Sequence, residues 1–587
     1  MSMQMTTRTT VLLIICVVLG TYYPVIFSPF NSVDDPGVYT YLLNVNSFGI
    51  REMFSTAGSV HYYRPVYWLS YWADKYIWGL EESFMHLENM VFHLLNVLLV
   101  FAVAHRVFLL KNFRSHWPPL IAALIFALHP LNTEAVNWIV GRTDLLAALF
   151  LLFSTWLLLR EKCHWGVVLL AATSLFVACL AKETAIFYLP AAVLLPFFLP
   201  AQTPSRPSIR YFLLSHWPLF IFFPVMGIGY FVFRHLMFVR GDAGVSHVVS
   251  RLTGGQGFGL FESAHLILKA AGFYLKKLFI PFPLNFGIIH VSDLYIPVGV
   301  FAVLLVFFCL KRRTLTTYFF FSAATIGSSA LLVPLLEATW TPLAERYMYI
   351  PSAFFVVGVV LLTTPWAVRL PRPHILVLSI GVLLCGFAYA TETRTLLWQS
   401  NLALFQDTLN KSPYFTPAKI HLALAMQEQG LDISGKDGLV SLRGAHPLGS
   451  SPSVLMDQAT ALFQQGKIHA ARGLLQRALK NPGRYEQQIL KHFLSQYDQL
   501  IMRLDSGQEL ILPETVPLLI RLYELSDDPF YLYRLGQAYL FLNDKEHAQE
   551  AFGRAAAQTV PTAYYYKAAL KLSKELGRGT ENKKGSR

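Results

Sequence analysis

Residues 117–160 read WPPLIAALIFALHPLNTEAVNWIVGRTDLLAALFLLFSTWLLLR, in which two apolar runs enclose a short polar segment. The runs, at about 118–137 and 143–160, have close to the length of roughly 20 mostly apolar residues that crosses a bilayer as a helix. The polar residues between the runs would then lie at one membrane face. This stretch predicts a hairpin of two transmembrane helices.

Apolar runs of the same kind recur through the first 390 residues, and 54% of the 587 residues are hydrophobic. We therefore predict an all-α polytopic membrane bundle, followed by a helical domain. The first run resembles a signal sequence but has no small-x-small cleavage site, so we expect it to remain as a span. The eleven expected spans lie at about 10–28, 85–110, 118–137, 143–160, 166–182, 184–200, 211–237, 294–310, 316–336, 347–366 and 374–391.

The apolar runs end near residue 391, and this change in composition divides the chain into three domains. Residues 1–391 form the membrane domain, 392–576 a helical domain without apolar runs, and 577–587 a basic tail that we expect to be disordered. The five cysteines lie in or beside apolar runs and have no metal-ligand spacing. We therefore expect no disulfide framework, no metal and no other cofactor.

The basic residues collect in alternate loops, which orients the chain. With a cytoplasmic N-terminus, the basic clusters that include Arg114, Arg160 and Arg313 all fall on the cytoplasmic side. The formal net charge of +13 then reflects membrane orientation, and we expect no nucleic-acid partner. The count requires that the stretch 262–281 lies in the membrane interface without crossing. The C-terminal domain is then outside, and we expect a bacterial inner membrane with this domain in the periplasm.

In this topology, five hairpins bring ionisable residues to the outer face. Charges at membrane depth are costly and usually pair with one another or line a functional cavity, so we interpret them as one shared site. The candidate catalytic residues are Asp34 and Asp35. The candidate substrate- and phosphate-binding residues are Arg64, His86, Glu88, His129, Glu134, Arg142, Asp144, Lys182, Glu183, Lys269 and Arg346.

Each part of this set also has a purely structural interpretation. Asp34 and Asp35 fit ordinary turn chemistry. His86, Asn89 and His93 share one helix face, where hydrogen bonds between spans are the better interpretation. The other charges fit interhelical pairs or interface anchors: Arg142 with Asp144, Lys182 with Glu183, and Glu345 with Arg346.

Transfer of a sugar from a lipid carrier suits such a site. A carboxylate of the first outer loop can accept the proton of an acceptor hydroxyl as general base. Arg and Lys can stabilise the negative charge that develops on the departing phosphate, and the apolar spans can hold the lipid chain. Nucleotide sugars are cytoplasmic, so chemistry at the outer face needs a lipid-carried donor.

Several segments carry a family resemblance. They are the Asp34-Asp35 pair, YRPVYWLSY at 63–71, HLENMVFHLLN at 86–96, HPLNTEAV at 129–136 with GRTDLL at 141–146, AKET at 181–184 and AERYMYIP at 344–351. The acidic pair is similar to the motif of GT-C membrane glycosyltransferases. The whole ordered set resembles the transmembrane-and-TPR protein O-mannosyltransferase family and extends over about 390 residues.

The resemblance implies a GT-C fold, a dolichyl- or undecaprenyl-phosphate sugar as co-substrate, and a metal-independent transfer that inverts the anomeric carbon. It implies that Asp34 or Asp35 is the base, without deciding between them. It also implies that Arg142, Lys182 and Arg346 are candidates for contact with the lipid phosphate. The C-terminal repeats are short, whereas animal members of the family have long arrays. The resemblance therefore supports sugar transfer more directly than it supports mannose as the sugar or a protein as the acceptor.

The C-terminal domain carries the repeat signal. Residues 529–562 have the length and spacing of one tetratricopeptide unit, and weaker signals cover 454–482 and 413–430. The segments 431–453 and 240–258 are expected to be loops, the second of which would gate the site. Stacked repeats form a concave surface that could dock an acceptor protein or glycan, or could act as scaffold alone.

Four functions stay open at this point, of which a transporter is the weakest, because the charges gather at one face whereas a transporter would place some near mid-membrane. The leading hypothesis is a glycosyltransferase that moves mannose or another hexose from a polyprenyl phosphate to an acceptor hydroxyl, most simply on protein. The second is a transferase that modifies a glycolipid or polysaccharide. The third is a non-catalytic membrane assembly factor, against which the presence of Asp34, Asp35 and the basic residues argues.

Overall fold

The computed structural model describes residues 6–44, 63–160, 164–199, 214–237, 260–289, 291–336, 341–413 and 415–428, then 455–494 with gaps, 508–559, and 561–584 with gaps. The predicted loops 240–258 and 431–453 lie outside these residues. The chain forms two compact units: Met1–Arg234 with Ala243–Leu431, and His235–Asp242 with Asp432–Arg587.

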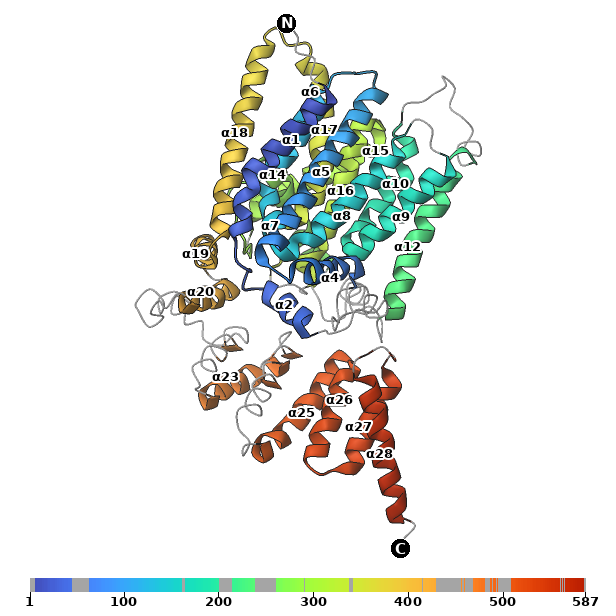
Figure 1. The fold of residues 1–587 in the computed structure, drawn as a ribbon, viewed down its shortest axis with the longest axis vertical. Helices are drawn as coiled ribbons and strands as arrows, with labels where there is room; N and C mark the ends of the chain where they lie inside the picture. The colour runs from blue at the N-terminus through green and yellow to red at the C-terminus, as the bar shows by residue number, and fades with distance from the viewer. Residues whose placement is uncertain are drawn as a thin grey trace. The chain divides into compact units, whose positions relative to one another are not determined.

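The first unit is a bundle in which α1, α5, α8, α9, α12 and α18 run side by side (Figure 1). Its longer helices are α1 Thr7–Tyr22, α5 Glu82–Leu110, α6 Trp117–Leu128, α8 Arg142–Leu158, α9 Trp165–Ala181, α12 Trp217–Met237, α14 Leu260–Phe279, α15 Ile296–Arg312, α16 Leu315–Leu336, α17 Tyr349–Ala367 and α18 Pro373–Trp398. The shorter ones are η1 Tyr23–Phe27, α2 Asp35–Asn44, α4 Pro65–Trp78, η2 Pro130–Asn132, α7 Thr133–Asn137, η3 Ile139–Gly141, η4 Glu183–Tyr188, α10 Leu189–Leu194, η5 Leu195–Phe197, η6 Asp293–Tyr295, η7 Glu345–Met348, α19 Asn401–Lys411 and α20 Thr416–Glu428.

Within the described residues, eight helices are long and apolar enough to cross a membrane, or nine if the bent pair Trp117–Leu128 and Pro130–Asn137 counts as one span. Shorter apolar helices at Trp165–Ala181 and Glu183–Phe197 coincide with two more of the expected spans. The all-α, multi-pass membrane fold is therefore confirmed, and the count of eleven crossings stays a prediction.

The expected span 118–137 is broken at His129. Its backbone is extended there (φ −66°, ψ 118°), because the residue before a proline avoids the helical region and Pro130 lacks an N–H. The two parts of the span are bent by 49°. Gly141 then lies so close to the chain that a Cβ atom would be 2.3 Å from the Ala135 carbonyl oxygen. The polar segment between α6 and α8 therefore folds back tightly into the protein, where irregular backbone is tolerated at membrane depth.

Two further helix junctions repeat this pattern. α9 ends at an extended Lys182 (φ −153°, ψ 127°) before η4 begins. Ala344 is likewise extended (φ −146°, ψ 148°) before η7 and α17. The expected span 184–200 consists of η4, α10 and η5, with prolines near the start of the last two. Such junctions place side chains at the ends of apolar helices.

The second unit contains α23 Ile468–Lys480, α25 Gln508–Ser526, α26 Pro529–Phe541, α27 Lys545–Gln558 and α28 Tyr566–Lys584. α26 and α27 cover the predicted repeat at 529–562, and Leu535, Ala548 and Phe552 lie in their shared core. Gly536 is needed there, since a Cβ atom would be 2.7 Å from the Phe552 ring. The tetratricopeptide assignment itself stays a prediction.

Two segments differ from expectation. α28 continues to Lys584, so the tail predicted to be disordered from residue 577 is helical up to that point; its Lys and Glu residues are good helix formers. The first compact unit extends to Leu431, whereas the sequence predicted a boundary at 391. α19 and α20, the second of which covers the expected half-repeat at 413–430, belong to the membrane unit because their apolar side chains pack against it.

Candidate active site

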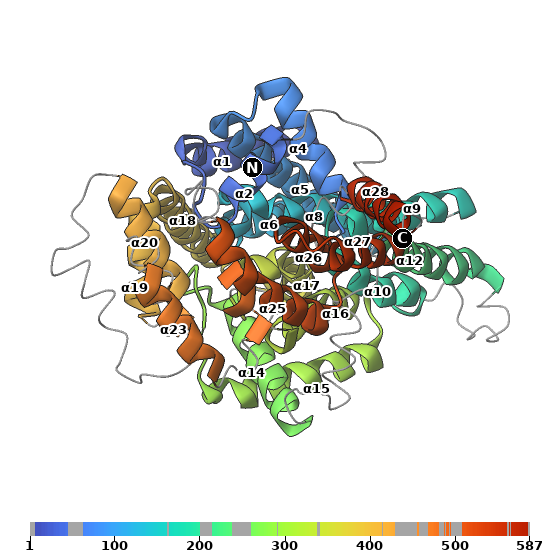
Figure 2. The same ribbon diagram turned by 90° about the horizontal axis from the view of Figure 1, so that it is seen from below.

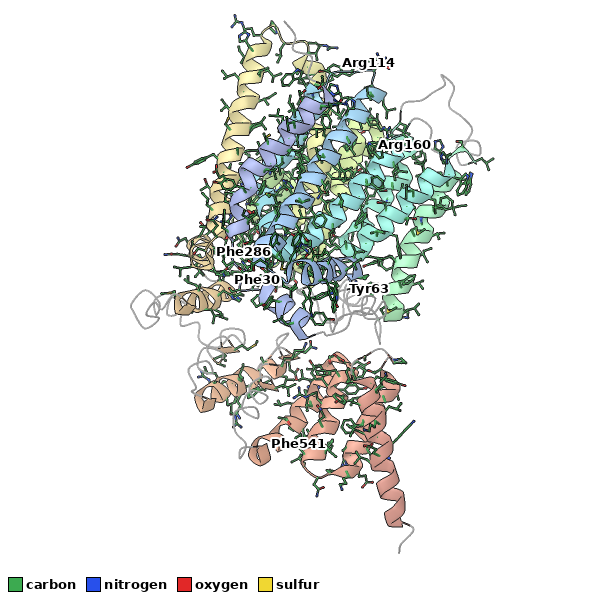
Figure 3. The ribbon with its side chains drawn as sticks, viewed as in Figure 1. Phe30, Tyr63, Arg114, Arg160, Phe286 and Phe541 are labelled. Carbon is green, nitrogen blue, oxygen red and sulfur yellow. The ribbon has the colours of Figure 1, made fainter. Side chains whose placement is uncertain are left out.

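The predicted site residues lie at helix ends and helix breaks. Asp35 begins α2, Arg142 begins α8, Lys182 follows α9, and Arg346 lies in η7 before α17. In Figure 3, Phe30, Tyr63 and Phe286 lie toward one end of the bundle, whereas Arg114 and Arg160 lie toward the other. The candidate residues therefore gather at the end opposite these basic loops.

The pair Lys182–Asp144 joins two hairpins. Lys182 Nζ lies 2.6 Å from each carboxylate oxygen of Asp144, and both side chains are buried. The alternative that Asp144 pairs with Arg142 is wrong, because Arg142 points to other carboxylates. A buried carboxylate and ammonium that are matched in this way hold the start of α8 and the end of α9 together.

Arg346 is held by Glu134. Its guanidinium bonds one Glu134 oxygen, while the other oxygen accepts the backbone N–H of Glu345 at 2.9 Å and of Arg346 at 3.2 Å. The guanidinium carbon also lies 4.8 Å from the centre of the Trp138 ring. Glu134 thereby fixes η7, and the Arg346 cation is oriented by an ion pair and an aromatic face at once.

Glu345 and Lys277 form a third buried pair, which sequence reasoning missed. Lys277 Nζ lies 2.6 Å from Glu345 Oε1, which also accepts the backbone N–H of Asn285 at 3.1 Å. Lys277 donates a further hydrogen bond to the Pro281 carbonyl at 2.9 Å. In the sequence, Lys277 lies within the stretch 262–281 that is expected not to cross the membrane, and it is not among the candidate site residues. The one signal in the sequence was that Pro281 follows Lys277 by four residues, so that the lysine can reach the backbone just after α14.

Arg64 and Glu183 form the most exposed pair of the site. The distance from Arg64 Nε to Glu183 Oε2 is 2.8 Å, and the two side chains are 15% and 28% exposed. Lys182 interacts electrostatically with Arg64 and with Arg346. Three cations from three different chain segments therefore lie near enough to influence one another electrostatically.

Arg142 is enclosed by protein on all sides. Its guanidinium lies 2.6 Å from Asp74 and 3.1 Å from Glu88, and its Nε donates to Asn89 at 2.9 Å. The side chain is 0% exposed and stacks over the Tyr71 ring. The structure does not favour the phosphate-binding role that the resemblance implied for Arg142, because none of its side chain is exposed, unlike Lys182 and Arg346. Its contacts instead tie α4, α5 and α8 together.

The two aspartates of the first loop differ in their surroundings. Asp35 is 1% exposed, and its Oδ2 accepts the backbone N–H of Asn31 at 2.7 Å. Its Oδ1 has no hydrogen-bond partner by distance and angle, although Trp138 and the Val140 backbone both act on the carboxyl group. Burial raises the pKa of Asp35 to about 8. Asp34 is only half-buried, and both carboxylates interact with Tyr67, as does Arg64.

The remaining candidates lie apart from this cluster. His129 bonds the Leu278 carbonyl at 3.2 Å and caps η2, and His86 is buried beside the backbone of Ser28 and Pro29. Lys269 pairs with the exposed Asp293 at 2.7 Å. We therefore leave His86, His129 and Lys269 out of the candidate site that Asp34, Asp35 and the three cations form.

For Asn89 and His93, the structure shows the hydrogen bonds between helices that the structural interpretation of this face of α5 predicts. Asn89 donates to the Trp138 carbonyl at 2.9 Å, and His93 Nδ1 lies 2.8 Å from the Tyr349 hydroxyl. Both side chains are fully buried. They join α5 to the segment after α7 and to α17, rather than facing a substrate.

The fold and the site define a multi-pass membrane protein with an aspartate pair beside three carboxylate-held cations. No family model and no solved structure matches the chain. Among curated proteins, the human protein O-mannosyl-transferase TMTC3 is 34% identical over 131 residues, which cover 21% of this chain and 13% of that protein. Protein O-mannosyl-transferase F38B6.6 of Caenorhabditis elegans is 23% identical over 385 residues (63% and 51%). Human protein O-mannosyl-transferase TMTC4 is 27% identical over 412 residues (61% and 54%).

These relatives confirm the resemblance to the transmembrane-and-TPR protein O-mannosyltransferases. The aligned stretches span at most about half the length of these relatives. The similarity therefore identifies what the chain is related to, and its own activity, donor and acceptor are matters for proposal.

Proposed function

We propose that the protein is an integral-membrane glycosyltransferase that moves a hexose, mannose by analogy with its relatives, from a polyprenyl phosphate to a hydroxyl group on a protein. One observation carries this proposal: the two aspartates and Arg64 all act electrostatically on Tyr67, and Arg64 and Arg346 both act on Lys182, so acidic and basic groups gather at one end of an apolar bundle. The names of the relatives support protein mannosylation. The second, helical unit offers a surface suited to a polypeptide acceptor.

Asp34 is the general base in this proposal. A base must reach the acceptor hydroxyl, and Asp34 is the more exposed of the two carboxylates. Asp35 is enclosed, and burial raises its pKa to about 8, so it carries a proton at neutral pH. We assign Asp35 a positioning role, in which it closes the loop through Asn31.

The transfer is a single displacement. The acceptor oxygen forms a bond to the anomeric carbon as the bond from that carbon to the phosphate oxygen breaks, and Asp34 takes the acceptor proton. Attack from the face opposite the phosphate inverts the anomeric centre. The departing lipid phosphate gains a negative charge, which Arg64, Lys182 and Arg346 stabilise.

The carboxylate partners are essential to this arrangement. An unpaired cation among apolar helices would be costly, so Glu183, Asp144 and Glu134 keep Arg64, Lys182 and Arg346 charged and in place. No metal is required by this scheme, and the metal-free site stays a prediction. The site end is extracytoplasmic by the positive-inside rule, since Arg114 and Arg160 lie toward the opposite end.

The test is a transfer assay with protein purified in lipid nanodiscs. Radiolabelled dolichyl- and undecaprenyl-phosphate mannose and glucose are offered with a Ser/Thr-rich peptide pool, and with a glycolipid extract in a parallel reaction. We expect label on peptide with the mannosyl donor and none with Asp34→Asn. Label on glycolipid alone would show that the acceptor is a glycolipid and not a protein. A folded protein that uses no donor would overturn the proposal and favour the assembly-factor alternative.

A further inference from the structure

The helices α19 and α20 follow the last apolar helix and belong to the membrane unit. Figure 2 shows them beside α18. Their side chains Phe405, Phe415 and Leu422 share one buried cluster with Trp138 and Phe286 of the site end. Trp138 is the residue on which the Arg346 guanidinium stacks. The α19–α20 pair therefore supports a wall of the candidate site.

Two polar contacts run from this pair to the aspartate loop. Asn401 Nδ2 of α19 donates to the Phe30 carbonyl at 2.9 Å. His421 Nδ1 of α20 lies 3.1 Å from Ser32 Oγ, two residues before Asp34. The loop is thus held at its start and two residues before the proposed base.

The His421 ring is itself fixed. It stacks on Phe405, with ring centres 5.3 Å apart and planes at 25°. Burial lowers the pKa of His421 to about 4, so the ring is neutral at physiological pH. It therefore acts on Ser32 through a hydrogen bond rather than through charge.

The same pair holds a second segment of the site. Asn285 Nδ2 donates to Ser412 Oγ at 2.9 Å, and Ser412 Oγ donates to the Gly287 carbonyl at 2.7 Å. A Cβ atom on Gly287 would lie 2.3 Å from the Phe415 ring, so no side chain fits there. The Asn285 backbone N–H in turn bonds Glu345, next to Arg346. Contacts of α19–α20 thus reach both the loop of the base and the segment beside a cation.

We propose that α19–α20 is a positioning element of the transferase, in which His421, through Ser32, sets the place of the Asp34 loop against the three cations. This inference rests on the proposed function. Proton transfer requires the base within hydrogen-bond reach of the acceptor hydroxyl, and small displacements of a reacting group cost much of the rate. A loop released from His421 would keep its aspartates and lose their alignment.

The test compares His421→Phe, Ser32→Ala and the double variant with His421→Gln and Lys411→Ala. Phe keeps the ring on Phe405 without a hydrogen-bonding nitrogen, whereas Gln keeps a polar group that can reach Ser32. Lys411 lies on α19 and pairs with Asp407 at 2.7 Å, so its variant is the matched control. Each protein is measured for kcat, for KM of the lipid donor, and for hydrogen exchange in a peptide covering residues 28–38.

We expect each of His421→Phe and Ser32→Ala to lower kcat by about 3- to 10-fold, the worth of one hydrogen bond, with an unchanged donor KM. The double variant should be no worse than either single, His421→Gln should recover part of the rate, and Lys411→Ala should match the wild type. Exchange in 28–38 should quicken in His421→Phe, Ser32→Ala and their double variant, and should stay unchanged in Lys411→Ala. Unchanged exchange, or single effects that multiply, would overturn the positioning role. If the wild type transfers no sugar, the proposed function fails, and the exchange data alone still decide whether His421 holds the loop.

Discussion

Asp34 and Asp35 are adjacent in the chain but occupy unlike surroundings: Asp34 is half-buried beside Tyr67, whereas Asp35 is 1% exposed and closes its own loop through Asn31. A pair of neighbouring carboxylates therefore divides into one group that can meet a substrate and one that shapes the backbone. Several measurable differences follow from this division.

Replacing Asp34 by Asn should lower kcat/KM for transfer by about 10²- to 10⁴-fold, the usual contribution of a general base. Asp35→Asn should cost at most about 10-fold at neutral pH, because Asn resembles the protonated Asp35 that burial favours. Initial rates in the radiolabel assay measure both. If Asp35→Asn is inactive and Asp34→Asn is active, Asp35 is the general base and Asp34 is not.

Stability should depend on pH through Asp35. Its pKa rises from an ordinary 3.8 to about 8 in the folded protein, so the folded state holds the proton more tightly than the unfolded state. The resulting stability is fully present below about pH 4 and is lost as the pH rises through about 8. Asp35→Asn removes this titration. Its unfolding temperature in detergent should therefore fall less than that of the wild type over this pH window, and parallel curves would contradict the assignment.

The Lys182–Asp144 pair offers a separation of structure from activity. Lys182→Met or Asp144→Leu alone should destabilise the protein by about 3–5 kcal/mol, because each leaves a buried charge without its partner. The double variant should regain most of that stability, as measured by thermal unfolding. It should still fail to transfer sugar if Lys182 acts on the lipid phosphate. Restored transfer in the double variant would show that Lys182 has a structural role only.

Arg346→Lys should raise the KM for the lipid donor about 10-fold. A lysine keeps the charge but loses the planar guanidinium that bonds Glu134 and stacks on Trp138. Lys269→Ala is the matched control and should stay within about twofold of wild type, since Lys269 pairs with an exposed aspartate away from the cluster. Equal effects of both changes would argue that general charge, and not the position of Arg346, governs donor use.

The topology can be tested with fusions at two loops. A reporter inserted after Arg160 should report the cytoplasm, and one inserted after α20 at residue 428 should report the extracytoplasmic side, as eleven crossings require. Both reporters on one side would contradict the span count. An inverted pair of signals would contradict the orientation.

The sequence predicted the apolar helices well because lipid imposes a requirement on composition that each segment must meet by itself. It also predicted that the ionisable residues share one end. The sequence could not predict which ionisable residues form ion pairs. Asp144 bonds Lys182, 38 residues away, and Glu134 bonds Arg346, 212 residues away. No local spacing encodes which hairpin packs against which.

The same limit explains the errors. Lys269 and Lys277 lie two turns apart on one helix, yet Lys269 pairs with an exposed residue and Lys277 is buried on Glu345. Composition could not tell these two lysines apart, because burial depends on the packing of α14. The extent of the membrane unit was misplaced for a related reason: α19 and α20 look soluble by hydropathy but bury Leu404 and Phe405 against the bundle.

The separation of 212 positions between Glu134 and Arg346 also constrains how the protein is made. A chain inserted into the membrane as it is synthesised places Glu134 long before the ribosome reaches Arg346. Throughout that interval the carboxylate must stay protonated, remain hydrated or be shielded by an insertion factor. A chain that stops before residue 346 never completes the pair and leaves the Glu134 carboxylate without its cation.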